Sequence, residues 1–283
     1  MADKRTPTQS FSDLVEIMTI LRKECPWDRQ QTHESIKDLM IEEIYEAIEA
    51  IDNDDPAELR KELGDLLLHV VFHTEIAREA GRFDIGEVIY GIQEKLIRRH
   101  PHVFEDTRAD DSESVKRNWE DLKMKETERK SVLQGVPDTL PALIKAQRMQ
   151  EKAASVGFDW QTWQQAWPKL QEEIEEFRQV AEQGSEEEKT DEFGDLLFSL
   201  VNVGRLAGLN VEDCLRMTNR KFKHRFQHIE EILEREGKAL NDTSLEEMDR
   251  IWDAAKSEDR KQNPEFRKQK SVDTEFRGLE NRD

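Results

Sequence analysis

The feature that most constrains this chain is a pattern of acidic residues that occurs twice, 130 residues apart. Its first part is a run of acids around one isoleucine, and a shift by 130 aligns Glu42, Glu43, Ile44 and Glu46 with Glu172, Glu173, Ile174 and Glu176. Its second part is a pair of acids before an apolar run, and the same shift aligns Glu62, Gly64, Asp65, Leu66, Leu67 and Val71 with Glu192, Gly194, Asp195, Leu196, Leu197 and Val201. The chain is therefore predicted to be a tandem duplication of one unit.

The acids in each part are three residues apart, which makes them neighbours on one face of a helix. Glu43 falls inside the apolar arc of its predicted helix, where an amphipathic helix normally carries no charge. Carboxylates this close repel by about 4 kcal/mol per pair at an effective dielectric of 20. Two helices would bring four carboxylates together in each half, and such a set of oxygen ligands favours Mg2+ or Mn2+.

The composition indicates an all-α soluble protein. Charged residues make up 37% of the chain, with only 12 glycines and 8 prolines. The net charge is 43 − 63 = −20, which argues against a nucleic-acid-binding surface. No membrane span or signal peptide is expected, and Cys25 and Cys214 lack metal-binding spacing. We expect reduced thiols and a cytoplasmic location.

The predicted fold is a tandem repeat of two helical bundles with four to five helices each. Thr32 is the expected N-cap of a helix that ends near Ile51. The helix after Asp65 is apolar nearly all round and is predicted to be fully buried. The expected organisation is a loose leader over 1–10, an N-terminal domain over 11–130, a linker over 131–141, a C-terminal domain over 142–256, and a charged, disordered tail over 257–283.

Basic and aromatic residues repeat in the same order as the acids. A Lys and an Arg four residues apart occur in both halves, as Lys95/Arg99 and Lys221/Arg225. A Trp and a Lys four residues apart also occur in both, as Trp119/Lys123 and Trp252/Lys256. Lys and Arg suit phosphate groups, and an indole suits a stacked base. The predicted ligand therefore has phosphates at one end and a flat ring at the other. The predicted reaction is metal-assisted hydrolysis of a phosphoanhydride.

These motifs resemble a known family. EExxE followed by ExxD on successive helices is similar to the MazG family of all-α nucleoside triphosphate pyrophosphohydrolases. The phrases CPWDRQQTHESI, VGFDW and RRHPHVF extend the resemblance over nearly all of residues 11–256. The resemblance implies hydrolysis of nucleoside triphosphates to nucleoside monophosphate and pyrophosphate. It also implies Mg2+ dependence, a homodimer and a role in cleaning the nucleotide pool.

The resemblance further implies roles for individual residues. The metal ligands would be Glu173, Glu176, Glu192 and Asp195 in the second half and Glu43, Glu46, Glu62 and Asp65 in the first. Nucleotide contacts would come from Lys169, Lys189, Lys221, Arg225, Trp252 and Lys256, and by repeat from Lys95, Arg99, Trp119 and Lys123. Glu172 and Glu175, beside the ligands, are candidate general bases. Leu39 and Leu59 replace Lys169 and Lys189 in the first half, which favours the second half as the main catalytic site.

Other interpretations stay open at this point. A Glu-rich helix is commonly a solvated face, and the Lys/Arg pairs could be ordinary surface residues. His69 and His73 have no counterparts in the second half, where Ser199 and Val203 stand, so they are interpreted as core or supporting histidines. The alternative function is a helical nucleotide-binding regulatory scaffold with one or both sites non-catalytic. Base and sugar preference, the number of metal ions and the phosphorus atom attacked are not predicted.

Overall fold

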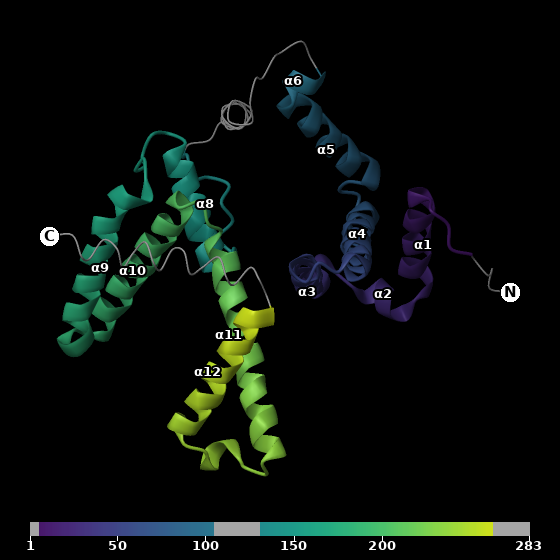
Figure 1. The fold of residues 1–283 in the computed structure, drawn as a ribbon. Helices are drawn as coiled ribbons and strands as arrows, with labels where there is room; N and C mark the ends of the chain where they lie inside the picture. The colour runs from purple at the N-terminus through teal and green to yellow at the C-terminus, as the bar shows by residue number, and fades with distance from the viewer. Residues whose placement is uncertain (1–5, 105–130, 263–283) are drawn as a thin grey trace. The chain divides into compact units, whose positions relative to one another are not determined.

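The computed structural model describes residues 6–104 and 131–262, and helices are the only regular structure within these ranges (Figure 1). The chain divides into two compact units, Met1–Lys123 and Met124–Asp283. The prediction of an all-α tandem arrangement is confirmed. The predicted helix around Trp119 lies outside the described residues.

In the first unit the structure describes α1 (Phe11–Glu24), α2 (Pro26–Gln30), α3 (His33–Asp52), α4 (Pro56–Glu79), α5 (Ile85–Arg99) and α6 (Pro101–Phe104). Helices α3 and α4 pack against each other, and α1 covers α4. The core between them consists of Met18, Ile36, Val71 and Phe72, all nearly fully buried. Burying these apolar side chains is the main force that holds α3 and α4 in place.

Local sequence signals fix the start of both α3 and α4. The Thr32 hydroxyl accepts a hydrogen bond from the Ser35 backbone N–H, as expected for the predicted N-cap. Asp55 caps α4 by accepting from the backbone N–H groups of Ala57 and Glu58, both at 3.0 Å. Because only three residues separate the helices, the acids near the end of α3 lie opposite those near the start of α4.

The second unit repeats this plan with α8 (Ala142–Ala154), α9 (Trp163–Gln183), α10 (Glu186–Leu206), α11 (Val211–Arg235), a short 3-10 helix (Leu240–Asp242) and α12 (Leu245–Gln262). Helices α9 and α10 form the pair equivalent to α3 and α4, with Ala166, Leu170 and Val203 between them. Helix α12 packs on α11. It continues to Gln262, six residues beyond the predicted domain end at 256, and the rest of the predicted tail lies outside the described residues.

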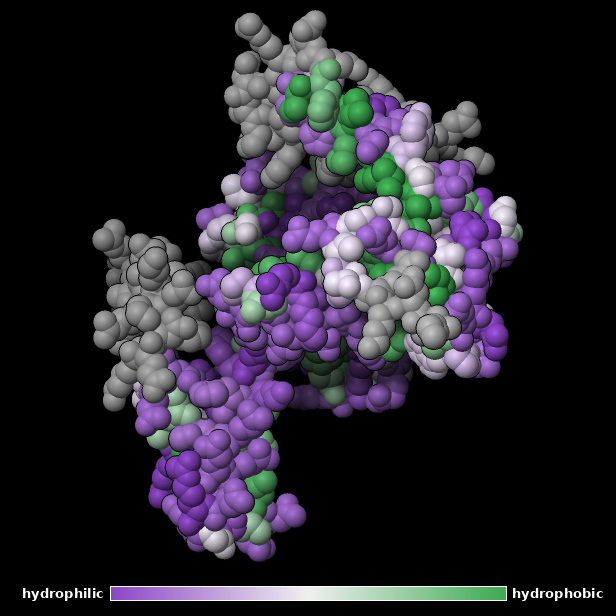
Figure 2. Space-filling model, turned by 90° about the vertical axis from the view of Figure 1, so that its right-hand side faces the viewer, coloured by the Kyte–Doolittle hydropathy of each residue, from purple (hydrophilic) through white to green (hydrophobic). Residues whose placement is uncertain are grey.

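The prediction of a fully buried helix after Asp65 is wrong. Leu67 and Val70 of α4 are 41% and 39% exposed, and Leu197 and Leu200 of α10 are 40% and 49% exposed. Each of these helices buries one face against its own unit and leaves the other apolar face open. Figure 2 shows a surface that is largely hydrophilic, with apolar residues gathered in separate stretches. No described helix is long and apolar enough to cross a membrane.

Candidate active site

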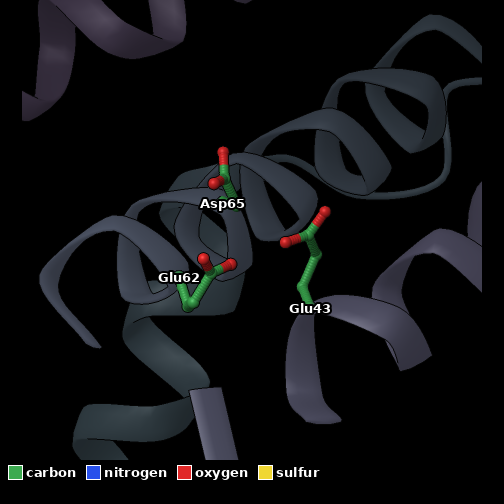
Figure 3. A group of neighbouring side chains, drawn as sticks. All are labelled: Glu43, Glu62 and Asp65. Atoms are coloured by element: carbon green, nitrogen blue, oxygen red, sulfur yellow. The ribbon is translucent and has the colours of Figure 1, made fainter. Parts of the chain in front are cut away.

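The first acidic cluster joins α3 and α4. One carboxylate oxygen each from Glu43, Glu62 and Asp65 lies within 4.8 Å of the others. Figure 3 shows Glu43 reaching from α3 toward the two acids on α4. The structure therefore brings together three of the four predicted ligands. Glu46 lies one turn from Glu43 and outside this tight group, although its carboxylate is affected by the charge of Glu62.

Repulsion and burial shape the protonation of this cluster. Burial raises the pKa of Glu43, and a hydrogen bond with Glu62 and the charge of Asp65 raise it further. The charge of Glu62 is also the main cause of the raised pKa of Glu46. By contrast, a hydrogen bond from Lys61 lowers the pKa of Glu62, the most buried of these acids. Each of these acids makes the charged form of its neighbours less favourable, and a bound cation would relieve that repulsion.

Lys61 is a site residue that the sequence interpretation missed. Its Nζ lies 2.9 Å from a Glu62 oxygen and 2.8 Å from a Glu58 oxygen. The first half therefore has its own lysine at the acids, supplied by a position different from Lys169 or Lys189. The absence of a lysine at the matching positions was one reason for favouring the second half, and Lys61 weakens that reason.

The second cluster joins α9 and α10 in the same way. Carboxylate oxygens of Glu173, Glu176 and Glu192 lie within 4.8 Å of one another, and Glu173 is 4% exposed. Lys169 lies beside them, with its Nζ 2.8 Å from both Glu172 and Glu173. Burial, followed by the charges of Glu173 and Glu172, raises the pKa of Glu176. As in the first cluster, an all-oxygen set with disfavoured charge fits a hard divalent cation.

Asp195, the fourth predicted ligand, lies outside this tight group and lines a cavity of about 790 Å³. Lys169 and Glu173 line the same cavity, so the acids and the lysine open directly into it. Its other walls are largely apolar and come from the linker, α8, the loop before α9, and α10: Leu133, Met149, Ala153, Phe158, Trp160 and Phe198. A charged end and an apolar body are what a ligand with phosphates and a flat ring requires.

Polar residues also lie in this cavity, and the sequence interpretation did not include them. Gln150 on α8 and Asn202 on α10 are 7% and 8% exposed. Arg205 forms a two-armed ion pair with Asp159, with N–O distances of 3.0 and 2.5 Å. Each amide lies on a helix face that also carries other polar residues, so the sequence did not single it out. The sequence did not show that the two faces meet.

The predicted nucleotide contacts on α11 and α12 lie apart from this cavity. Arg225 donates to Asp259 at 2.8 Å, and its guanidinium carbon lies 5.5 Å from the Trp252 ring centroid. Neither residue lines the described cavity, and neither do Lys221 and Lys256. On α10, the Lys189 Nζ lies 3.2 Å from a Glu186 oxygen.

The corresponding contacts of the first half are only partly described. Lys95 and Arg99 lie on α5, and Trp119 and Lys123 lie outside the described residues. The two candidate bases flank the second cluster. Glu172 receives a hydrogen bond from Lys169, while Arg178 binds Glu175 through two nitrogens and lowers its pKa.

An all-α repeat with paired carboxylate clusters, one of them opening into a largely apolar cavity, is an arrangement that fits a divalent cation and a phosphorylated ligand. The MazG nucleotide pyrophosphohydrolase domain matches residues 31–104 and 161–230. The chain therefore belongs to the MazG family and contains its domain twice. Both matched segments include the full set of predicted metal ligands of their half.

Similar proteins from other organisms support this assignment. The nucleoside triphosphate pyrophosphohydrolase/pyrophosphatase MazG of Thermotoga maritima is 46% identical over 88% of this chain and 96% of its own length. The nucleoside triphosphate pyrophosphohydrolase of Escherichia coli K12 is 41% identical over 87% of this chain and 97% of its own length. The protein YabN of Bacillus subtilis is 49% identical over 89% of this chain and 52% of its own length.

Proposed function

We propose that this chain is an Mg2+-dependent nucleoside triphosphate pyrophosphohydrolase that releases nucleoside monophosphate and pyrophosphate, and that its second unit is the main catalytic site. The observation that carries this proposal is the cavity beside the second acidic cluster, which Lys169, Glu173 and Asp195 line together. Family membership and the names of the Thermotoga and Escherichia relatives support the reaction. A role in cleaning the nucleotide pool is part of the proposal.

In the proposed mechanism, Glu173, Glu176, Glu192 and Asp195 would hold Mg2+, with Mn2+ as a substitute. When bound, such a cation neutralises phosphate charge and makes a water molecule more acidic. Lys169, which lines the cavity, would approach the phosphates and offset their remaining charge, and Lys189 on α10 would add positive charge if it left Glu186. Glu172 and Glu175 are the candidate bases, and each is held by a cation: Lys169 donates to Glu172, and Arg178 donates to Glu175 and lowers its pKa. The apolar cavity walls enclose the nucleoside and exclude water from it.

The first unit is proposed to bind a cation in a regulatory role. Its cluster of Glu43, Glu62 and Asp65 has the same chemistry as the second cluster. However, Phe72, which corresponds to the cavity residue Asn202 after the shift by 130, is part of the hydrophobic core. This favours a unit that retains the acids and lacks the same space for a base.

Pyrophosphate release from a panel of nucleoside triphosphates tests the proposed reaction. We expect release that depends on Mg2+ and falls by about 1000-fold in Glu173→Ala, a loss typical of removing a group that stabilises transition-state charge. Glu43→Ala is the matched change in the first unit and should cause a much smaller loss. The enzyme proposal fails if the parent chain releases no pyrophosphate from any triphosphate, and the assignment to the second unit fails if Glu43→Ala is the more damaging change.

We further propose a cytoplasmic homodimer in which the α11/α12 pair of one copy completes the site of the other. Arg225 and Trp252 are in contact with each other and do not line the described cavity. Leu197 and Leu200, which point away from the core of their own unit, offer an apolar surface for a second copy. Both described cysteines are free thiols, which supports a reducing compartment.

Mixed dimers test this arrangement. Glu173→Ala and Arg225→Ala would each be inactive alone, but co-expressed they should recover about a quarter of the parent activity, because half of the dimers would contain one intact site out of two. Glu173→Ala with Glu192→Ala is the matched control, since both changes affect the acidic cluster and no intact site can form. Equal inactivity of both mixtures would show that the α11/α12 pair completes the site of its own chain.

A further inference from the structure

Gln150 lines the cavity of the second unit and has a buried side-chain oxygen without a hydrogen-bond partner among the described residues. Its Nε2 donates to the backbone carbonyl of Phe198 at 2.9 Å, which fixes the orientation of the amide. The other end, Oε1, is buried and has no hydrogen-bond partner among the described residues. Buried polar atoms in folded proteins are nearly always paired, so the unpaired carbonyl of this cavity-lining residue is an acceptor that a bound ligand could satisfy.

A second amide, that of Asn202, has the opposite end available. Its Oδ1 accepts from Arg205 through Nε at 3.2 Å and Nη2 at 2.6 Å. Arg205 is itself held by Asp159, so this orientation is also fixed. The Asn202 amide therefore presents its N–H2 group as the donor. Together, Gln150 and Asn202 offer the cavity one acceptor and one donor, both on rigid helices.

The position of Asn202 along α10 matches the length of a nucleoside. Asp195 and Asn202 are seven residues apart on this helix, which corresponds to about 10 Å along its axis. Phe198, which also lines the cavity, lies between them in the sequence. A phosphate at the acidic end would thus leave room for the sugar and place the base at Gln150 and Asn202.

We propose that Gln150 is a specificity-determining residue whose Oε1 accepts a hydrogen bond from an N–H group on the edge of the base, while Asn202 donates to the neighbouring ring nitrogen or carbonyl. This inference rests on the proposed function of the second unit. Cytosine and adenine each carry an amino group beside a ring-nitrogen acceptor, so both fit this fixed pair of amides in one pose. A ring that lacks the amino group leaves the Gln150 oxygen unpaired.

The expected difference in affinity between a base with the N–H group and one without it follows from the burial of Gln150. A site built to hydrogen-bond a substrate N–H group discriminates strongly against an analogue without it, because the buried partner is left unpaired. In the free protein Oε1 is already unpaired, so only part of this discrimination is expected. We expect CTP to bind about 10-fold more tightly than pyrimidin-2-one riboside triphosphate, which is CTP without its amino group.

Calorimetric binding of these two triphosphates to the full chain with Mg2+ tests the proposal. The roughly 10-fold preference for CTP should fall to about 1 in Gln150→Met, which keeps the shape and removes the acceptor. Gln147→Met changes a glutamine on the same helix that does not line the cavity, and it should keep the preference. ATP and purine riboside triphosphate should repeat the result for a purine.

The outcomes separate this inference from the proposed reaction. Equal binding of CTP and its analogue by the parent chain would overturn the role of Gln150, and would indicate that solvent pairs with Oε1 instead. A preference that survives in Gln150→Met would also overturn it. Loss of the preference only in Gln150→Met supports the inference even if the chain releases no pyrophosphate, because binding is measured without turnover. Thermal unfolding of each variant confirms that it is folded.

Discussion

The two units have similar acidic clusters but differ in the space beside them. Each cluster combines a buried glutamate with further acids from two adjacent helices and one nearby lysine, Lys61 in the first unit and Lys169 in the second. Beside the second cluster lies a cavity with apolar walls and two fixed amides. The charge arrangement was thus retained after duplication, while the surroundings diverged.

The shift by 130 shows where the divergence lies. Three cavity residues on α10 correspond to three buried residues on α4: Ser199, Asn202 and Arg205 to His69, Phe72 and Glu75. Phe72 belongs to the core of its unit, and Glu75 is paired with Arg78. His73 stacks on His33, with their Nδ1 atoms 2.9 Å apart, which agrees with its interpretation as a supporting residue. In the first unit, larger side chains therefore stand in place of Ser199 and Asn202, and a differently paired one stands in place of Arg205.

The largest expected effect is on the stability of the first unit, where Phe72 occupies the position of Asn202. Because Phe72 is 5% exposed and packs with Met18, Ile36 and Val71, Phe72→Ala should destabilise the first unit by about 3–5 kcal/mol. Denaturant unfolding with hydrogen exchange of α3 and α4 measures the loss. Tyr90→Ala, a change at a 68% exposed aromatic residue of the same unit, should cost far less. Equal losses would show that Phe72 does not support the core.

A smaller effect should follow from giving the second unit the residue of the first. Asn202→Phe would fill the cavity and remove the amide donor, so kcat/KM for nucleoside triphosphates should fall by about 100-fold, or about 3 kcal/mol. The acids stay in place, so binding of Mg2+ alone should persist. Asn210→Phe, at the N-cap of α11, is a control outside the cavity. Full activity of Asn202→Phe would break the link between the cavity and the substrate.

The smallest expected effect concerns the repulsion between carboxylates, which both clusters share. Burial and neighbouring acids raise the pKa of Glu43 in the folded chain, so its charged form destabilises the metal-free fold at pH 7. That destabilisation disappears as the pH falls through the raised pKa. Glu43→Gln should therefore stabilise the metal-free protein at pH 7 by at most about 1 kcal/mol, with a smaller gain toward pH 4.

Thermal unfolding with a metal chelator measures this difference, and Glu49→Gln, at an exposed acid on the same helix, is the control. Added Mg2+ should raise the Tm of the parent more than that of Glu43→Gln. A stabilisation by Glu43→Gln that grows as the pH falls would contradict the assigned direction of the pKa.

Sequence alone was sufficient for the features that depend on local spacing. The acid pairs, the Thr32 cap and the helix pairs follow from patterns within a few turns of chain, and the repeat doubled each signal. Burial of α4 and α10 was mispredicted, because apolar residues around a helix do not show which face its own unit covers. Gln150 and Phe198 are 48 residues apart, so their contact depends on how α8 crosses α10, which no local pattern shows.

Helix α10 has a consequence for which phosphate is cut. It carries Glu192 and Asp195 near one end and Asn202 farther along, on a single uninterrupted helix. If the base binds near Asn202 as proposed, this rigid helix sets the distance from the base to the acids and therefore determines which phosphorus atom lies at Glu192 and Asp195. Shortening or lengthening the phosphate chain would then leave the cleavage position, counted from the sugar, unchanged.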